Sequence, residues 1–182
     1  VAHFEAVAGA SPVPILVYNV PANTGVNAAP ATVARIAAHP NVAGVKDSSG
    51  DWNNTKAMID AFAKQGFEVF AGSEVFLLKN MRAGGVGCIT AGANVNPHGI
   101  DRVYQGWQSA EAEKLQADAD QVRQILQSQI SMIPALKAAI AHYAQDADWM
   151  TVRPPLVELT VEQRAKMVSE LLAAGFDMPG IK

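Results

Sequence analysis

Short apolar runs alternate with amphipathic stretches along the first two thirds of the chain. Four runs rich in β-branched and aliphatic residues have the length and flanking turns of strands, at residues 13–19, 42–46, 67–72 and 87–92. A stretch with helical periodicity follows each run, at residues 30–39, 53–66, 73–85 and from residue 96 onward. Near-continuous apolar strands joined by crossover helices predict a parallel sheet that is covered on both faces.

The spacing of these four βα units is regular and matches the repeat of a TIM barrel. We therefore predict an α/β fold, the C-terminal half of a (β/α)₈ barrel, with an open doubly wound sheet as the alternative. The sequence begins without Met and inside a helical pattern that places Phe4, Val7 and Ala8 on one face. We expect it to be the C-terminal part of a longer enzyme.

The pattern becomes purely helical after residue 108. Residues 109–130 predict a long amphipathic helix, and one of its faces carries Leu115, Ala119, Val122, Ile125 and Leu126. A second helix is expected at residues 133–145. A third, at 160–175, is opened by a Thr160–Gln163 capping box and closed by Gly175. These patterns predict two domains, a catalytic half barrel at residues 1–108 and a helical C-terminal domain at residues 109–182.

Composition narrows the classes of function. The 182 residues are 49% hydrophobic and 17% charged, with a net charge of −3, so no basic surface for nucleic acid is expected. No apolar run approaches the ~20 residues of a membrane span, and no signal peptide pattern opens the chain. The single cysteine, Cys88, favours a reducing, cytoplasmic location and is expected to be a small buried hydrophobe. The four histidines are scattered, so no metal site is predicted.

The residues at the carboxyl ends of the predicted strands carry the candidate chemistry, because active sites of parallel βα folds lie at that edge. Lys46 is the only one of eight lysines that ends a strand. A lysine desolvated in a barrel mouth has a lowered pKa and a larger neutral fraction. A neutral amine attacks a ketone or aldehyde to form a Schiff base.

Tyr18 ends the neighbouring predicted strand at the same level as Lys46. Its phenol could shuttle the proton that carbinolamine formation and C–C cleavage require. Plainer interpretations stay open for both residues. Lys46 could extend its amine to solvent or pair with Asp47, and Tyr18 could be a packed aromatic whose hydroxyl is satisfied.

The blocks "YNVPANTG", "HPNVAGVKDSSGD", "FAGSEVFLL" and "AGGVGCITAGANVNP", with "RPPLVEL" before the last helix, occur in this order. In these motifs the sequence resembles the dihydrodipicolinate synthase / N-acetylneuraminate lyase superfamily of pyruvate-dependent class I aldolases. The resemblance implies a (β/α)₈ barrel with a helical C-terminal domain, assembled as a dimer or homotetramer. It also implies lyase chemistry on small molecules without a cofactor, because the substrate is held as an imine on the enzyme.

The resemblance assigns roles to individual residues. It makes Lys46 the lysine that forms the imine with the keto carbon of pyruvate, and Tyr18 the proton relay. It makes Ile89 part of the pyruvate pocket and Gly72 a glycine of close approach at the end of its strand.

The remaining site residues bear on the second substrate. Synthases that condense pyruvate with aspartate semialdehyde usually have Arg where this sequence has Asn23, and Asn cannot make a bidentate pair with a carboxylate. We therefore expect Asn23, Ser48 and Ser49 to face a polar aldehyde. The motifs are closest to 4-hydroxy-2-oxoglutarate and 2-keto-3-deoxy-sugar-acid aldolases, which implies retro-aldol cleavage of such acids.

Two alternatives remain, a 4-hydroxy-tetrahydrodipicolinate synthase of lysine biosynthesis and a non-catalytic truncated assembly module. The family binds the carboxylate of pyruvate with a Gly-Thr-Thr-Gly-Glu type of loop, and this sequence contains none. An isolated fragment with these residues alone is therefore expected to be inactive.

Overall fold

The computed structural model describes residues 1–181, and it divides into two compact units, Val1–Thr90 and Ala91–Lys182. Helix α6 (Pro97–Gly106), which the sequence pattern grouped with the barrel units, lies in the second of them. The division of catalytic from helical residues at position 108 stays a prediction.

The first unit contains a four-stranded parallel sheet in the order β1-β2-β3-β4. Its strands are β1 (Ile15–Asn19), β2 (Val42–Asp47), β3 (Glu68–Ala71) and β4 (Gly87–Cys88). Its helical segments are α1 (Ala2–Ala10), α2 (Pro21–Thr24), α3 (Pro30–Ala37), α4 (Trp52–Phe62), η1 (Ala63–Gln65), η2 (Glu74–Phe76) and α5 (Leu77–Ala83). The predicted succession of four parallel βα units is confirmed.

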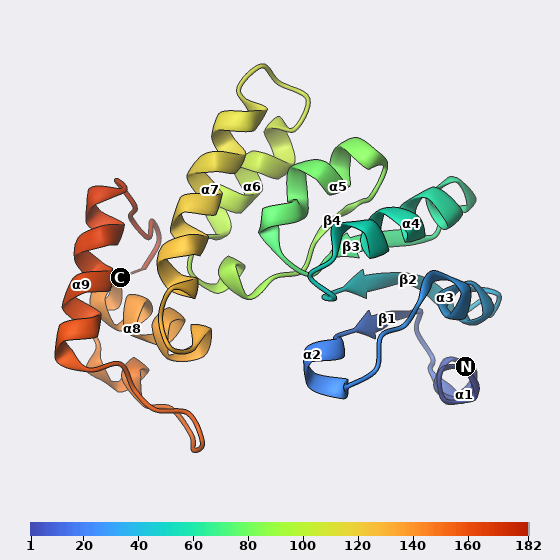
Figure 1. The fold of residues 1–182 in the computed structure, drawn as a ribbon, viewed down its shortest axis with the longest axis horizontal. Coiled ribbons are helices and arrows are strands. Elements are labelled where there is room, and N and C mark those ends of the chain that lie inside the picture. The colour runs from blue at the N-terminus through green and yellow to red at the C-terminus, as the bar shows by residue number, and fades with distance from the viewer. Residues whose placement is uncertain (182) are drawn as a thin grey trace. The chain divides into compact units, whose positions relative to one another are not determined.

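Helices cover one face of this sheet. Val17, Val45 and Val69 lie side by side in register, are completely buried, and pack with residues of α1, α3 and α4. Figure 1 shows α3, α4 and α5 along this side. On the other face Leu16 and Tyr18 are 38% and 50% exposed.

A sheet covered on both faces was therefore the wrong expectation for the described residues. Continuous apolar runs indicate burial on both faces. Such runs do not indicate whether the helices that bury each face belong to the same stretch of sequence as the strands.

Strand β4 ends at Cys88 and is therefore shorter than the predicted run at residues 87–92. The short helix η3 (Ala91–Asn94) follows it. A side chain completes the edge of the sheet here. Asn80 of α5 is fully buried, and its Nδ2 donates to the carbonyl oxygens of Val69 at 3.0 Å and Gly87 at 2.9 Å. Gly85 leaves the space for this side chain, since an ideal Cβ there would lie 2.3 Å from Asn80 Nδ2.

The second unit is helical and holds η3, α6, α7 (Ala112–Gln127), α8 (Met132–Ala144), η4 (Ala147–Met150) and α9 (Val161–Ala173). Its core contains Leu126, Ala139, Met167 and Leu171. The predicted capping box is present. Thr160 Oγ1 accepts from the N–H of Gln163 at 3.2 Å, and the Thr160 N–H donates to Gln163 Oε1 at 2.8 Å.

Within residues 1–181, no helix is long and apolar enough to span a bilayer. The His, Cys, Asp and Glu side chains of these residues form no group of three or more that could hold a metal ion.

Candidate active site

The parallel register of β1 and β2 places Tyr18 directly beside Lys46. The Lys46 Nζ lies over the face of the Tyr18 ring, 4.0 Å from its centroid. Both side chains belong to the open face of the sheet, where Tyr18 is 50% exposed and Lys46 is half-buried. An ammonium over an aromatic face is attracted by about 0.5–1 kcal/mol at an exposed site. The structure therefore brings the predicted amine and phenol together on a surface that a solute can reach.

Lys46 is not paired with Asp47 in the part of the chain that the structure describes. Successive residues of a strand point to opposite faces, and the Asp47 side chain lies on the helix-covered face, 3% exposed. Its carboxylate accepts only from neutral donors, among them Asn19 Nδ2 at 2.7 Å and Thr55 Oγ1 at 2.6 Å. The ion-pair interpretation of Lys46 does not hold.

Gly72 follows β3 and packs against the turn after β2. Its N–H donates to the carbonyl oxygen of Asp47 at 2.8 Å. An ideal Cβ on Gly72 would lie 2.0 Å from Ser48 Oγ and 2.7 Å from Ser48 Cα. Gly72 is thus in close contact with the turn that carries Ser48, and its role at the substrate site stays a prediction.

Ile89 extends the pairing of β3 and β4 by one residue, since its N–H donates to the Ala71 carbonyl oxygen at 2.9 Å. Its side chain is 40% exposed. A role in the pyruvate pocket stays a prediction.

The predicted aldehyde-facing residues differ in their surroundings. The Ser49 hydroxyl donates to Asp47 Oδ2 at 2.9 Å, so its proton is already used inside the protein. Asn23 lies on the exposed turn α2, where its N–H donates to the Val20 carbonyl oxygen at 3.0 Å. Roles for Asn23, Ser48 and Ser49 in substrate binding stay predictions.

Two buried polar residues beside this site were missed by the sequence analysis. Asn19 and Asp47 are each 3% exposed and face each other across β1 and β2, one position beyond Tyr18 and Lys46. The alternation of side chains along a strand could have indicated their burial, because the last residue of each strand lies on the same face as the buried valines.

Cys88 lies beside a buried carboxylate. Glu74, 3% exposed, accepts a hydrogen bond from Thr90 Oγ1 at 2.5 Å. Burial of the thiol, and then the negative charge of Glu74, raise the pKa of Cys88 from 9.0 to about 12. The thiol therefore stays protonated at neutral pH. Cys88 is half-buried, whereas the sequence predicted full burial.

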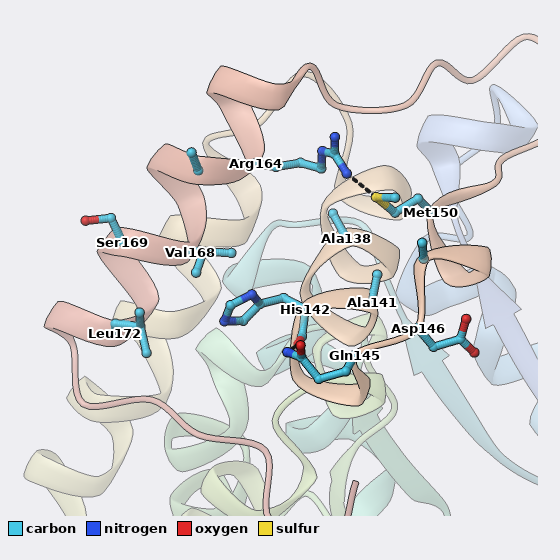
Figure 2. Close-up of a pocket in the computed structure, with 12 residues that line it drawn as sticks. Ala138, Ala141, His142, Gln145, Asp146, Met150, Arg164, Val168, Ser169 and Leu172 are labelled. Atoms are coloured by element: carbon cyan, nitrogen blue, oxygen red, sulfur yellow. Dashed lines mark hydrogen bonds between the residues drawn. The ribbon is translucent and has the colours of Figure 1, made fainter. Parts of the chain in front are cut away.

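A groove of about 680 Å³ lies within the second unit, between α8, η4 and α9 (Figure 2). Ala138, Ala141, Val168 and Leu172 give it an apolar lining. Arg164 points across it and donates to Met150 Sδ, whereas its buried Nε has no hydrogen-bond partner within residues 1–181. The groove contains none of the predicted site residues.

The sequence matches a known protein family over most of its length. Residues 1–174 match the model of the dihydrodipicolinate synthetase family. A 4-hydroxy-tetrahydrodipicolinate synthase of Listeria monocytogenes serotype 4a is 34% identical over 170 residues, which cover 91% of this chain and 56% of that protein. The chain thus spans a little over half the length of this relative.

Solved structures share the fold. YagE, a prophage protein from E. coli K12 solved in complex with pyruvate, aligns with a TM-score of 0.88 at 26% identity, over 97% of this chain and 61% of that one. A 2-keto-3-deoxygluconate aldolase of Sulfolobus solfataricus aligns with a TM-score of 0.81 at 22% identity, over 94% and 57% of the two chains, which shows the fold alone. The predicted fold, half of a TIM barrel followed by helices, is confirmed. With the match over residues 1–174, the chain belongs to the dihydrodipicolinate synthetase family.

Proposed function

We propose that this chain carries the imine-forming residues of a class I lyase that acts on pyruvate, or another 2-oxo acid, and an aldehyde. The observation that carries the proposal is the Lys46 amine 4.0 Å from the centre of the Tyr18 ring, on the open face of the sheet at the ends of β1 and β2. Membership of the family and the pyruvate named for the YagE structure support it.

The chemistry follows from these two side chains. The neutral amine of Lys46 attacks the keto carbon, and the carbinolamine loses water to give an iminium. The cationic nitrogen then accepts the electron pair released when the C–C bond breaks, so no external cofactor is needed. Tyr18 supplies and removes the protons of these steps. The ammonium over the Tyr18 ring must first lose a proton and turn off the ring face before its nitrogen can attack the keto carbon.

The direction we favour is retro-aldol cleavage of a 4-hydroxy-2-oxo acid or a 2-keto-3-deoxy sugar acid. Asn23 lacks the fixed charge that a second carboxylate would need, and it lies on an exposed turn. The second candidate is condensation of pyruvate with aspartate semialdehyde, which the name of the Listeria relative favours. Pyruvate release from each acid, measured beside dihydrodipicolinate formation, separates the two. We expect the active form to be a homo-oligomer.

Imine trapping tests the proposal. After intact-mass measurement, the protein is incubated with pyruvate, reduced with borohydride and mapped by mass spectrometry. We expect one adduct, on Lys46, and none in Lys46→Arg. Lys56 is a matched control because it is an exposed lysine paired with Asp60 at 2.6 Å. In a protein whose intact mass shows that it includes the loop for the pyruvate carboxylate, adducts shared equally between Lys46 and Lys56, or no adduct at all, would contradict the proposal.

A further inference from the structure

The geometry points to Asp47 as the positioning residue of this site, an inference that rests on the function proposed above. Asp47 does not touch the open face on which Lys46 and Tyr18 lie. Its carboxylate and its carbonyl oxygen instead hold together the segments that carry the candidate residues.

Five hydrogen bonds converge on the Asp47 carboxylate. Oδ1 accepts from Asn19 Nδ2 at 2.7 Å and from the Ser49 N–H at 3.1 Å. Oδ2 accepts from Ser49 Oγ at 2.9 Å, Asn54 Nδ2 at 3.2 Å and Thr55 Oγ1 at 2.6 Å. All five donors are neutral, so the stabilisation of this buried carboxylate comes from hydrogen bonds aimed at it.

The donors belong to three different segments. Asn19 ends β1, Ser49 lies in the turn after β2, and Asn54 and Thr55 lie in the first turn of α4. The Asp47 carbonyl oxygen adds the segment after β3 by accepting from the Gly72 N–H at 2.8 Å. A single residue thus joins the ends of β1, β2 and β3 to the start of α4.

Asn19 extends the network to the loop that carries Asn23. Its Nδ2 also lies 2.8 Å from Asn27 Oδ1, and its Oδ1 accepts from the Ala28 N–H at 2.9 Å. The main chain closes the arrangement, because the Ser48 N–H donates to the Asn19 carbonyl oxygen at 2.8 Å. Every loop with a candidate substrate contact before β4 is therefore anchored on the pair Asn19–Asp47.

The consequence for chemistry comes from the register. Asn19 faces Asp47 one position beyond Tyr18 and Lys46, so the buried pair sets the separation of β1 and β2 where the phenol and amine protrude on the opposite side. A shift of about 1 Å between reacting groups can lower a rate about 100-fold. Loss of the carboxylate leaves buried donors unpaired, and the strands separate to satisfy them.

The first test is Asp47→Asn, an isosteric change that turns one acceptor oxygen into a donor facing other donors. The number of working sites is counted by borohydride trapping at saturating pyruvate, and the rate of imine formation is expressed per trappable Lys46. A purely structural role would lower the count and leave the rate per site unchanged. We expect that rate to fall about 100-fold, with a smaller change in the pyruvate concentration for half-saturation.

Thr55→Val provides a milder variant, because it removes one donor and keeps the shape of the side chain. We expect about a tenfold loss in the rate per site, with native circular dichroism. Asp60→Asn, an exposed carboxylate on the same helix paired with Lys56, is the matched control and should leave the rate unchanged. The double variant Asn19→Asp with Asp47→Asn restores a hydrogen-bond acceptor facing a donor across β1 and β2. It should recover part of the rate per site that Asp47→Asn loses.

Different outcomes refute the proposed function and the positioning role of Asp47. A wild-type protein that includes the loop for the pyruvate carboxylate and still forms no adduct on Lys46 refutes the proposed function, whatever Asp47 does. Wild-type trapping with an unchanged rate per site in Thr55→Val and Asp47→Asn refutes the positioning role alone. A count that falls in Asp47→Asn while the rate of Thr55→Val stays at the wild-type value also refutes it.

Discussion

Gly72 has no room for a side chain, and Gly72→Ala tests how rigidly the turn after β2 is held. A Cβ at this position would lie 2.0 Å from Ser48 Oγ, 2.7 Å from the Asp47 carbonyl oxygen and 2.7 Å from Ser48 Cα. The hydroxyl can rotate away, but the two main-chain atoms cannot. Overpacking of this kind costs about 1–3 kcal/mol. In the variant, distortion of the hydrogen bond from the N–H of residue 72 to the Asp47 carbonyl oxygen adds about 1 kcal/mol. We expect a loss of about 2–4 kcal/mol in the free energy of unfolding.

Urea unfolding followed by circular dichroism measures this loss. Ser48→Gly in the Gly72→Ala background removes only the contact with Oγ, so we expect it to recover less than half of the loss. Gly9→Ala is the matched control, because the nearest atom to a Cβ there is 3.9 Å away and the residue is helical. It should be neutral or stabilise the protein by about 0.5–1 kcal/mol. Equal midpoints for wild type and Gly72→Ala, or complete rescue by Ser48→Gly, would refute the assignment of the clash to the main chain.

Two further predictions concern other parts of the chain. The pKa of Cys88 is raised from 9.0 to about 12, so its thiolate fraction at pH 8 is about 1,000-fold below that of an unfolded cysteine. Iodoacetamide should therefore label the native protein correspondingly more slowly than the protein in urea. The unfolded chain releases this proton near pH 9 and the folded chain only near pH 12, so the free energy of unfolding should fall as the pH rises through this window, and less steeply in Cys88→Ala. Thr160→Ala removes one half of the capping box and should lower the unfolding free energy by about 1 kcal/mol; no change in the urea midpoint would show that α9 does not depend on its cap.

The strand ends were the most predictable part of the site. Apolar runs that stop within a residue or two of the ends of β1 and β2 locate those ends, and parallel pairing makes Tyr18 and Lys46 neighbours one position before them. The contact that completes the edge of the sheet beside β4 was not predictable, because Asn80 reaches from α5 to the carbonyl oxygens of two other segments. Such a contact has no signature in local periodicity.

The environment of Asp47 was also beyond the sequence pattern. An acidic residue next to a lysine suggested an ion pair, whereas its donors come from β1, the following turn and α4. Burial of a carboxylate by neutral donors depends on several segments meeting in space. The alternation along the strand nevertheless placed Asp47 on the covered face, and weighing that position would have separated it from Lys46.

The β1–α3–β2 segment, residues 15–47, has a consequence for engineering. It contains the amine, the phenol and the buried Asn19–Asp47 pair, whereas Gly72, Glu74, Ile89 and Thr90 come from later segments. The residues proposed to form the imine and the residues that follow β3 and β4 therefore come from different segments. Libraries confined to residues 73–76 and 89–90 should change the pyruvate concentration for half-saturation with the Lys46 adduct intact, while recombination inside residues 15–47 should seldom yield active progeny.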